Sequence, residues 1–311
     1  MTFPNALSAP LTRATLWMLG AIVSLSTMAI SGRELSSELT TFQILFFRSL
    51  ASFVLMVLLL SRAGWGHILT RYFHIHLIRN LAHFGGQYGW FYGIALIPLA
   101  EVFALEFTMP IWTALLAAAM LGERISKQRI VAIVIGFAGV LVMLRPGFAV
   151  VSPVALVVLA AALAFGFAHT MTKRLAATDS PLAILFWTAA VQMPLAFLPA
   201  LTEWAWPSIH LWPWVFAVGA AALSAHYCLA RALVLEDAAV VMPIDFLRLP
   251  FIAVVGFLFY DESPDFWIFV GAAIVFTGSW LNLRGGPGKG RDTREAANSP
   301  EAVENGSCAS S

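Results

Sequence analysis

Residues 79–129 read RNLAHFGGQYGWFYGIALIPLAEVFALEFTMPIWTALLAAAMLGERISKQR, and this stretch decides the class of fold. It holds two long apolar runs that are separated by a proline. Arg79, His83 and Gln87 lie within or beside the first run, and Glu106 lies within the second. A charged side chain near the centre of a bilayer costs at least about 2.5–3.5 kcal/mol, so such groups normally face a cavity or a partner. We therefore interpret the stretch as two membrane-spanning helices with a polar interior face.

The same stretch recurs in weaker form 139 residues later in the chain. Similarity at a fixed period indicates an internal duplication, which has to be recognised before the fold is assigned. The matched pairs are Tyr88 with Tyr227, Glu106 with Asp245, Phe107 with Phe246, Glu123 with Glu262, Gly139 with Gly278 and Arg145 with Arg284. We therefore expect two copies of one structural unit.

The composition is that of an integral membrane protein. Hydrophobic residues make up 60% of the 311 and charged residues 11%, whereas soluble domains carry about 25% charged residues. The net charge of +1, without a basic stripe, gives no reason to expect a nucleic-acid partner. The two cysteines, Cys228 in an apolar run and Cys308 in a polar tail, do not form a disulfide framework. The expected surroundings are therefore a lipid bilayer.

The apolar runs predict an all-α fold with ten transmembrane helices. A span needs about 20 mostly apolar residues. Stretches of that kind occupy residues 14–31, 40–61, 74–97, 99–121, 127–145, 152–172, 181–201, 211–234, 238–260 and 264–283. We expect two five-helix units, 14–147 and 148–284, after a cytoplasmic lead, 1–13. The polar residues 285–311 have no periodicity, which predicts a disordered cytoplasmic tail.

The distribution of Lys and Arg predicts the orientation of the helices. With the N-terminus inside, the cytoplasmic loops and both ends collect most of the basic side chains, and a Lys/Arg excess marks that side. The loop 122–129, GERISKQR, carries three basic residues, whereas its partner 261–266, DESPDF, carries none. We therefore expect both termini in the cytoplasm and the second unit inverted relative to the first.

These residues resemble a known family. PIWTALLAAAMLGERIS (110–126), followed by GFAGVLVMLRPG (136–147), is similar to the fourth and fifth helices of the drug/metabolite transporter superfamily, in its EamA-type branch. The resemblance implies a ten-helix inverted-repeat transporter of small metabolites in a bacterial inner membrane, with no cofactor and no ATPase domain. The second copy departs from this pattern. It has DES at 261–263 in place of GER, and Pro250 is one residue from the position equivalent to Pro110.

A stripe of polar side chains runs along the predicted helix 74–97. Arg79, His83, Gln87 and Trp90 recur at intervals of three or four residues, the spacing of one helix face. A lipid-facing His and Gln would be costly, so this face is expected to line a cavity. The candidate substrate-binding residues are His83, Gln87, Tyr88 and Trp90, with His226 and Tyr227 at or beside the equivalent positions of the second copy.

Four glycines, Gly85, Gly86, Gly89 and Gly93, lie among these residues. Small residues let helices pack closely in membranes, and they also let a planar ligand approach the backbone. The sequence leaves both interpretations open.

Glu106 and Asp245 are the candidate coupling residues, because they occupy equivalent positions in the two copies. An inverted repeat would bring them towards a shared cavity near the midplane, where secondary transporters bind substrates and ions. Arg248 follows Asp245 by three residues and either forms a structural ion pair with it or takes part in a charge relay. Arg48 either pairs with a carboxylate on another helix, such as Glu106, or meets an anionic group of the substrate.

The expected activity is transport rather than catalysis. The chain has no phosphate-binding loop, no set of residues with metal-ligand spacing and no nucleophile with its base. The aromatic helix 74–97 suits a planar ring, and the general pattern resembles the branch that imports vitamins and S-adenosylmethionine. We therefore expect uptake of riboflavin or a similar heterocycle. The alternatives are an amino-acid or metabolite exporter, an S-adenosylmethionine transporter and, remotely, an intramembrane enzyme; a homodimer is compatible with the sequence.

Overall fold

The computed structural model describes residues 9–121, 127–145, 152–236, 244–263 and 265–284. Within these ranges the regular structure is entirely helical, without a strand. The α-helices are α1 (Ala9–Leu35), α2 (Thr41–Ala63), α3 (Phe73–Leu96), α4 (Leu99–Glu106), α5 (Met109–Leu121), α6 (Lys127–Leu144), α7 (Pro153–Leu175), α8 (Pro181–Ala200), α9 (Trp212–Leu235), α11 (Arg248–Tyr260) and α12 (Phe266–Arg284). Short 3₁₀ helices are η1 (Trp65–Ile68), η2 (Leu201–Glu203) and η3 (Ile209–Leu211).

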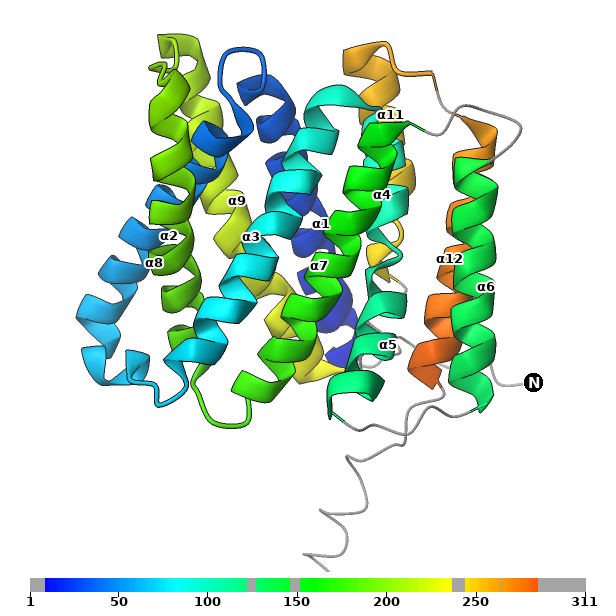
Figure 1. The fold of residues 1–311 in the computed structure, drawn as a ribbon, viewed down its shortest axis with the longest axis horizontal. Coiled ribbons are helices and arrows are strands. Elements are labelled where there is room, and N and C mark those ends of the chain that lie inside the picture. The colour runs from blue at the N-terminus through cyan, green and yellow to red at the C-terminus, as the bar shows by residue number, and fades with distance from the viewer. Residues whose placement is uncertain (1–8, 122–126, 146–151, 237–243, 264, 285–311) are drawn as a thin grey trace, which may run out of the picture.

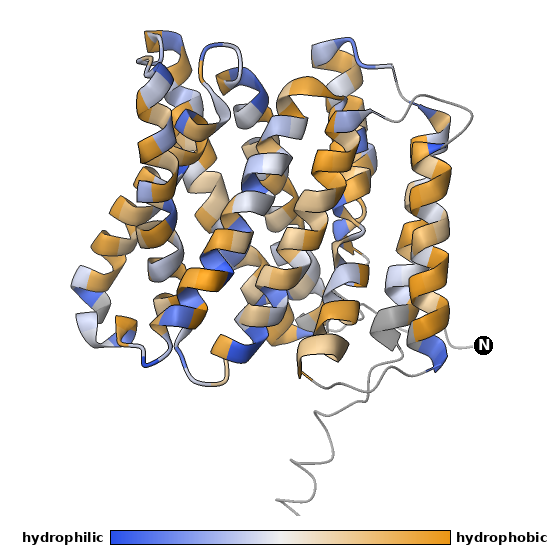
Figure 2. Ribbon diagram, viewed as in Figure 1, coloured by the Kyte–Doolittle hydropathy of each residue, from blue (hydrophilic) through white to orange (hydrophobic). Residues whose placement is uncertain are grey.

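Six helical segments of the described chain are long and apolar enough to cross a membrane. They are Leu11–Leu35, Thr41–Arg62, Leu99–Leu121, Pro153–Leu175, Pro181–Glu203 and Ile209–Leu235, and three shorter apolar helices are Ile130–Leu144, Arg248–Tyr260 and Phe266–Leu281. The polar side chains of α3 exclude it from this set, because they lower its mean hydropathy. Figure 2 shows hydrophilic residues at several points along α3 and towards the helix ends, while apolar residues dominate elsewhere.

The helix positions agree closely with those predicted, with three differences. The first helix is longer than predicted and runs over Ala9–Leu35. The predicted helix 238–260 is interrupted by a turn at Phe246 and Leu247, just before α11. The apolar run 99–121 is broken into α4 and α5 at Phe107 and Thr108. Pro110 explains this break, because it has no N–H to donate to the carbonyl of Glu106 one turn earlier. The predicted lead up to residue 8, the loop 122–126, part of the predicted helix 238–260 and the tail 285–311 lie outside the described residues.

The helices stand side by side in one bundle, and the closest pairs each join an early helix to a late one. α1 packs on α9, α3 on α7, α2 on α8 and α6 on α12. Figure 1 shows α2 and α8 at one edge of the bundle and α6 and α12 at the other, with α4, α5 and α11 beside the central helices. α1 begins and α12 ends on the same side of the molecule.

Two glycines allow α6 and α12 to approach each other at nearly backbone distance. A Cβ placed on Gly139 would lie 2.7 Å from the carbonyl oxygen of Gly271, and one on Gly278 would lie 2.7 Å from that of Ala132. The two contacts are equivalent under the 139-residue offset, since residues 139 and 132 correspond to 278 and 271. Close approach through small residues is a common way of packing helices in membranes.

Candidate functional site

A buried arginine joins two carboxylates where the broken helices meet. Arg248 Nη2, at the start of α11, donates to Glu106 Oε1 at 3.2 Å and to Asp245 Oδ2 at 3.1 Å. The other oxygen of Glu106, Oε2, accepts a hydrogen bond from Trp90 Nε1 of α3 at 2.7 Å. Arg248 is only 2% exposed. The arrangement therefore gathers one positive and two potentially negative groups in the interior, next to the break between α4 and α5.

Aromatic rings surround this acid–arginine cluster. The guanidinium carbon of Arg248 lies 4.8 Å from the ring centre of Phe103 and 5.0 Å from that of Phe107. Phe107 stacks on Phe246 with ring centres 4.2 Å apart and planes inclined by 17°. These two phenylalanines occupy equivalent positions in the repeat, so the two copies meet directly at the cluster.

Part of the cluster is left without a protein partner. Among the described residues, Arg248 Nε and Nη1 and Asp245 Oδ1 are buried and make no hydrogen bond. An unmade hydrogen bond at a buried group costs roughly 1–3 kcal/mol. A ligand that supplies an acceptor to Arg248 or a donor to Asp245 would recover that free energy.

A second polar cluster lies further along α3. Arg79 Nε donates to Thr172 Oγ1 of α7 at 3.1 Å, and its Nη1 donates to Asn80 Oδ1 at 2.8 Å and to Thr188 Oγ1 of α8. Gln192 Nε2 of α8 lies 2.8 Å from His83 Nδ1. This contact engages Nδ1 of the imidazole and leaves Nε2 as the second ring nitrogen.

Three more basic side chains face the same region from other helices. Arg48 of α2, His169 of α7 and His226 of α9 lie within electrostatic range of His83. Arg48 is 6% exposed, and no hydrogen bond or ion pair holds it within the described chain. His226 Nδ1 donates to the carbonyl of Ala222 at 2.7 Å. We call Arg48, Arg79, His83, His169 and His226 the basic cluster.

The structure divides the predicted site residues between these two clusters. Trp90, Glu106, Asp245 and Arg248 belong to the acid–arginine cluster, and Arg48, His83 and His226 belong to the basic cluster. Gln87 lies between the two on α3, buried and with its Oε1 unpartnered. The sequence analysis offered Glu106 as a possible partner of Arg48. In the structure Glu106 pairs with Arg248 instead.

The two predicted tyrosines lie outside both clusters. Tyr88 packs against Phe42 of α2, with ring centres 4.7 Å apart, and stacks on Tyr92 at 6.1 Å. Tyr227 is 58% exposed and presents an edge to Trp17 of α1, with ring centres 5.5 Å apart. Tyr227 therefore stays a sequence-based candidate that belongs to neither cluster.

The glycines of α3 serve helix packing at three of four positions. Added Cβ atoms at Gly86, Gly89 and Gly93 would each lie 3.0 Å or less from a side chain of α7. Gly85 has open space instead, with no atom within 4 Å of its added Cβ.

Several residues of the clusters escaped the sequence analysis. Phe103 supplies an aromatic face to Arg248, while Asn80, Thr188 and Gln192 complete the network around Arg79. Gln192 carried a usable signal, because it is an amide within the apolar run 181–201. Phe103 carried none, since phenylalanines are common throughout the chain.

Two apolar pockets of the described surface include no residue of either polar cluster in their lining. One, of about 850 Å³, is lined by side chains of α2, α8 and α9 and of the segment 201–212, including Phe197, Trp204 and Trp206. The other, of about 400 Å³, is lined by residues of α3, α5 and α7. Neither includes a charged side chain, so the chemistry of the polar clusters and not the apolar volume identifies the candidate site. No group of residues in the described chain has the makeup of a metal site.

An all-helical membrane fold with buried charges at broken helices defines a membrane transporter. The chain belongs to the EamA-like transporter family, which it matches over residues 12–145 and again over residues 152–284. The recognition made from the sequence is thereby confirmed, together with the duplication of the family domain.

Named relatives and a solved structure agree with this assignment. The chain is 28% identical over 259 residues to an S-adenosylmethionine uptake transporter of Rickettsia prowazekii, which covers 83% of this chain and 88% of the relative. It is 28% identical over 272 residues to a riboflavin transporter of Rhizobium johnstonii, with 86% and 90% covered. The pseudopaline exporter CntI of Pseudomonas aeruginosa is also 28% identical, over 259 residues, with 82% and 90% covered. A crystal structure that is 17% identical shares the fold, with a TM-score of 0.59 over 87% of this chain and 96% of that one.

Proposed function

We propose that the chain is a secondary transporter that takes up riboflavin or a planar heterocyclic metabolite of similar shape. One observation carries this proposal. The equivalent helix breaks of the two copies meet at Phe107 and Phe246, beside buried and partly unpartnered charges. Discontinuous helices that meet near the midplane are where secondary transporters bind substrates.

The packing supports a ten-helix architecture of two inverted five-helix units, 14–147 and 148–284. In the repeat, α1 corresponds to α7, α2 to α8, α3 to α9 and α6 to α12. Exchanging the two copies therefore converts the packed pair α1–α9 into the packed pair α7–α3, and it converts the pairs α2–α8 and α6–α12 into themselves. The reciprocal contacts of Gly139 and Gly278 follow the same exchange. In this architecture both termini lie in the cytoplasm, as the loop charges predict, and alternating access is a rocking of one unit against the other.

The α3 stripe connects the two polar clusters and sets the size of the substrate. His83 and Trp90 are separated by seven residues, or about 10 Å along a helix axis. A fused ring could stack near Phe107 while its polar chain reaches Gln87 and His83. Aromatic stacking contributes about 0.5–1.5 kcal/mol beyond the area buried.

S-adenosylmethionine is the second candidate, and the charges of the acid–arginine cluster favour it. Two carboxylates around one arginine have a net charge of −1 when ionised, which suits a sulfonium cation. Riboflavin carries no such charge.

Uptake into proteoliposomes tests the proposal. The purified full-length chain is reconstituted, and entry of labelled riboflavin and of labelled S-adenosylmethionine is measured, each with an excess of the other unlabelled compound. Saturable entry of either compound, absent from protein-free liposomes, supports uptake of a planar heterocycle. Efflux of preloaded substrate without entry would indicate an exporter, and transport of neither compound would refute the proposal.

A further inference from the structure

The basic cluster carries charge that the described protein does not balance. Arg48 of α2 and Arg79 of α3 both lie within electrostatic range of His83 and His226, and Arg79 also lies within range of His169. The described carboxylates that form ion pairs or hydrogen bonds do so elsewhere, for example Glu106 and Asp245 with Arg248. The part of the chain that the structure describes gives none of these five side chains a carboxylate partner.

The two arginines differ in how they are held. Neutral groups satisfy Arg79, which donates to threonine and asparagine oxygens and so keeps a fixed orientation. Arg48 is only 6% exposed, and its Nε has no hydrogen-bond partner among the described residues. A buried ion without a partner is strongly unfavourable. The unpartnered guanidinium of Arg48 and the fixed guanidinium of Arg79, both within electrostatic range of His83, are the arrangement expected of an anion-binding site.

We propose that the basic cluster is an oxyanion site that binds a carboxylate or a phosphate group. Arg48 would donate two parallel hydrogen bonds to it, since a guanidinium fork matches the oxygens of either group. Gln192 engages Nδ1 of His83, so Nε2 is the ring nitrogen left over, and as Nε2–H it would be a third donor. Arg79 would add positive charge behind them.

That this anion is one end of the transported molecule rests on the proposed function. The stripe on α3 then gives the substrate a direction, with its anionic end at Arg48 and its ring at the acid–arginine cluster. S-adenosylmethionine has a carboxylate and fits this requirement, whereas riboflavin meets it only as a phosphorylated derivative.

Binding of simple anions to the purified full-length protein tests the site without any transport. The probes are inorganic phosphate and malonate, titrated at constant ionic strength, and the readout is the quenching of tryptophan fluorescence together with the apparent Tm. We expect at least one probe to saturate. The dissociation constant should rise about 10- to 150-fold in Arg48→Gln, as for the loss of a hydrogen bond to a charged group. The dissociation constant of Arg48→Lys should lie between those of the wild type and of Arg48→Gln.

The control is Arg231→Gln, which removes an exposed arginine whose guanidinium lies 5.6 Å from the ring of Trp17 and should leave binding unchanged. Saturation by phosphate alone identifies a phosphate site, and saturation by malonate alone identifies a carboxylate site. Absence of saturation in the monodisperse wild type, or equal affinities in wild type and Arg48→Lys and Arg48→Gln, would overturn the proposal. If anions bind but no heterocycle is taken up, the site stands and the proposed function fails.

Discussion

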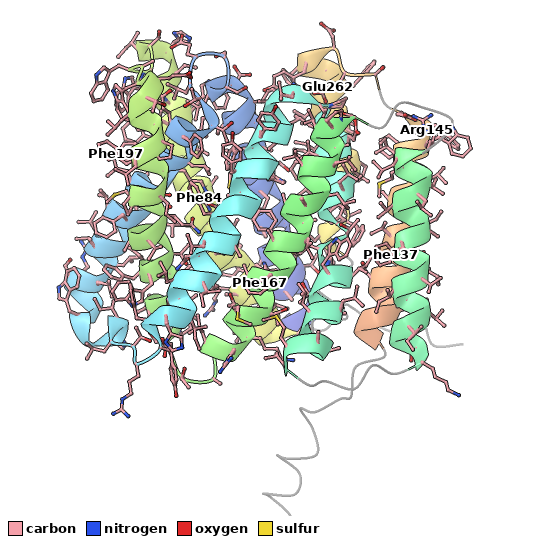
Figure 3. All side chains as sticks on the ribbon, viewed as in Figure 1. Phe84, Phe137, Arg145, Phe167, Phe197 and Glu262 are labelled. Carbon is pink, nitrogen blue, oxygen red and sulfur yellow. The ribbon has the colours of Figure 1, made fainter. Side chains whose placement is uncertain are left out.

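Glu262 links three segments at one end of the bundle, and its loss should open that end. Its Oε1 accepts from Arg33 Nη2 at 2.7 Å, and its Oε2 accepts from the backbone N–H of Leu99 at 2.8 Å. Arg33 Nη2 also donates to the carbonyl of Ile97 at 2.6 Å. Glu262, which is labelled in Figure 3, lies between α11 and α12 and thereby ties the end of α1 to the corner between α3 and α4. We predict that Glu262→Gln shifts the protein towards a state open at this end.

The size of the shift follows from the geometry. A hydrogen bond to a charged group contributes about 1.5–3 kcal/mol. The side chains of Arg33 and Glu262 are 20% and 12% exposed, so their pairing is less screened than the median surface pair of about 0–1 kcal/mol. Glutamine keeps one neutral acceptor but loses the charge. The expected loss of about 1.5–3 kcal/mol corresponds to about a 10- to 150-fold change in the ratio of open to closed protein.

Thiol accessibility measures this ratio. A single cysteine replaces Ala100, which is 8% exposed and adjoins Leu99, in a background without Cys228 and Cys308. The rate of labelling by a membrane-impermeant maleimide should rise in Glu262→Gln by up to the calculated factor. The control is Arg145→Gln, which breaks a pair with Asp265 at the same end.

The control pair is expected to matter little, because its side chains are 34% and 37% exposed. An unchanged labelling rate in folded Glu262→Gln would refute the reasoning. An equal rise in Arg145→Gln would show that general loosening, rather than the tie to α1 and α4, controls access.

Two further predictions concern charged contacts. Glu106→Gln removes the charge that faces Arg248 with little change of volume, so the initial rate of uptake should fall about 10-fold or more at unchanged membrane abundance. Uptake rates of Glu106→Gln equal to those of the wild type from pH 5 to 8 would contradict a role of Glu106 in coupling. Burial raises the pKa of the Asp179 carboxyl, but hydrogen bonds from Thr70 and His76 outweigh it and leave the pKa below its ordinary value. A carboxyl whose pKa is lowered in the folded state stabilises that state at neutral pH, and this stabilisation by Asp179 is lost as the pH falls below about 4. The apparent Tm in detergent should therefore drop there, and parallel curves for wild type and Asp179→Asn would refute the assignment.

The fold was largely predictable because a membrane simplifies the problem. The length of an apolar run fixes the existence and bounds of a span, and α3 begins and ends within one residue of the predicted 74–97. The break between α4 and α5 was not predicted, because the apolar run continues through it. Pro110 was visible in the sequence, but a proline near the middle of a span can kink a helix as well as end it.

Residues of the candidate site were predictable where the repeat, the polar stripe of one helix or an isolated charge in an apolar run identified them. Glu106 and Asp245 stood out because they are equivalent, and the spacing of Asp245 and Arg248 offered an ion pair between them. The choice of Arg248 rather than Arg48 as the partner of Glu106 depends on which helices are neighbours, and no spacing along the chain contains that information. For the same reason the sequence did not reveal that Tyr227 faces Trp17.

The duplicated halves are alike where they pack and different where they carry charge. Phe107 and Phe246 stack on each other, and Gly139 and Gly278 make reciprocal contacts. At the clusters the correspondence fails, because Met109 stands opposite Arg248 and Ala222 opposite His83 under the 139-residue offset. In the proposed inverted-repeat architecture, the symmetric scaffold would allow the bundle to open towards either side by equivalent motions. An asymmetric site allows the substrate to bind in only one orientation, so the same contacts can hold it in both states while access changes around it.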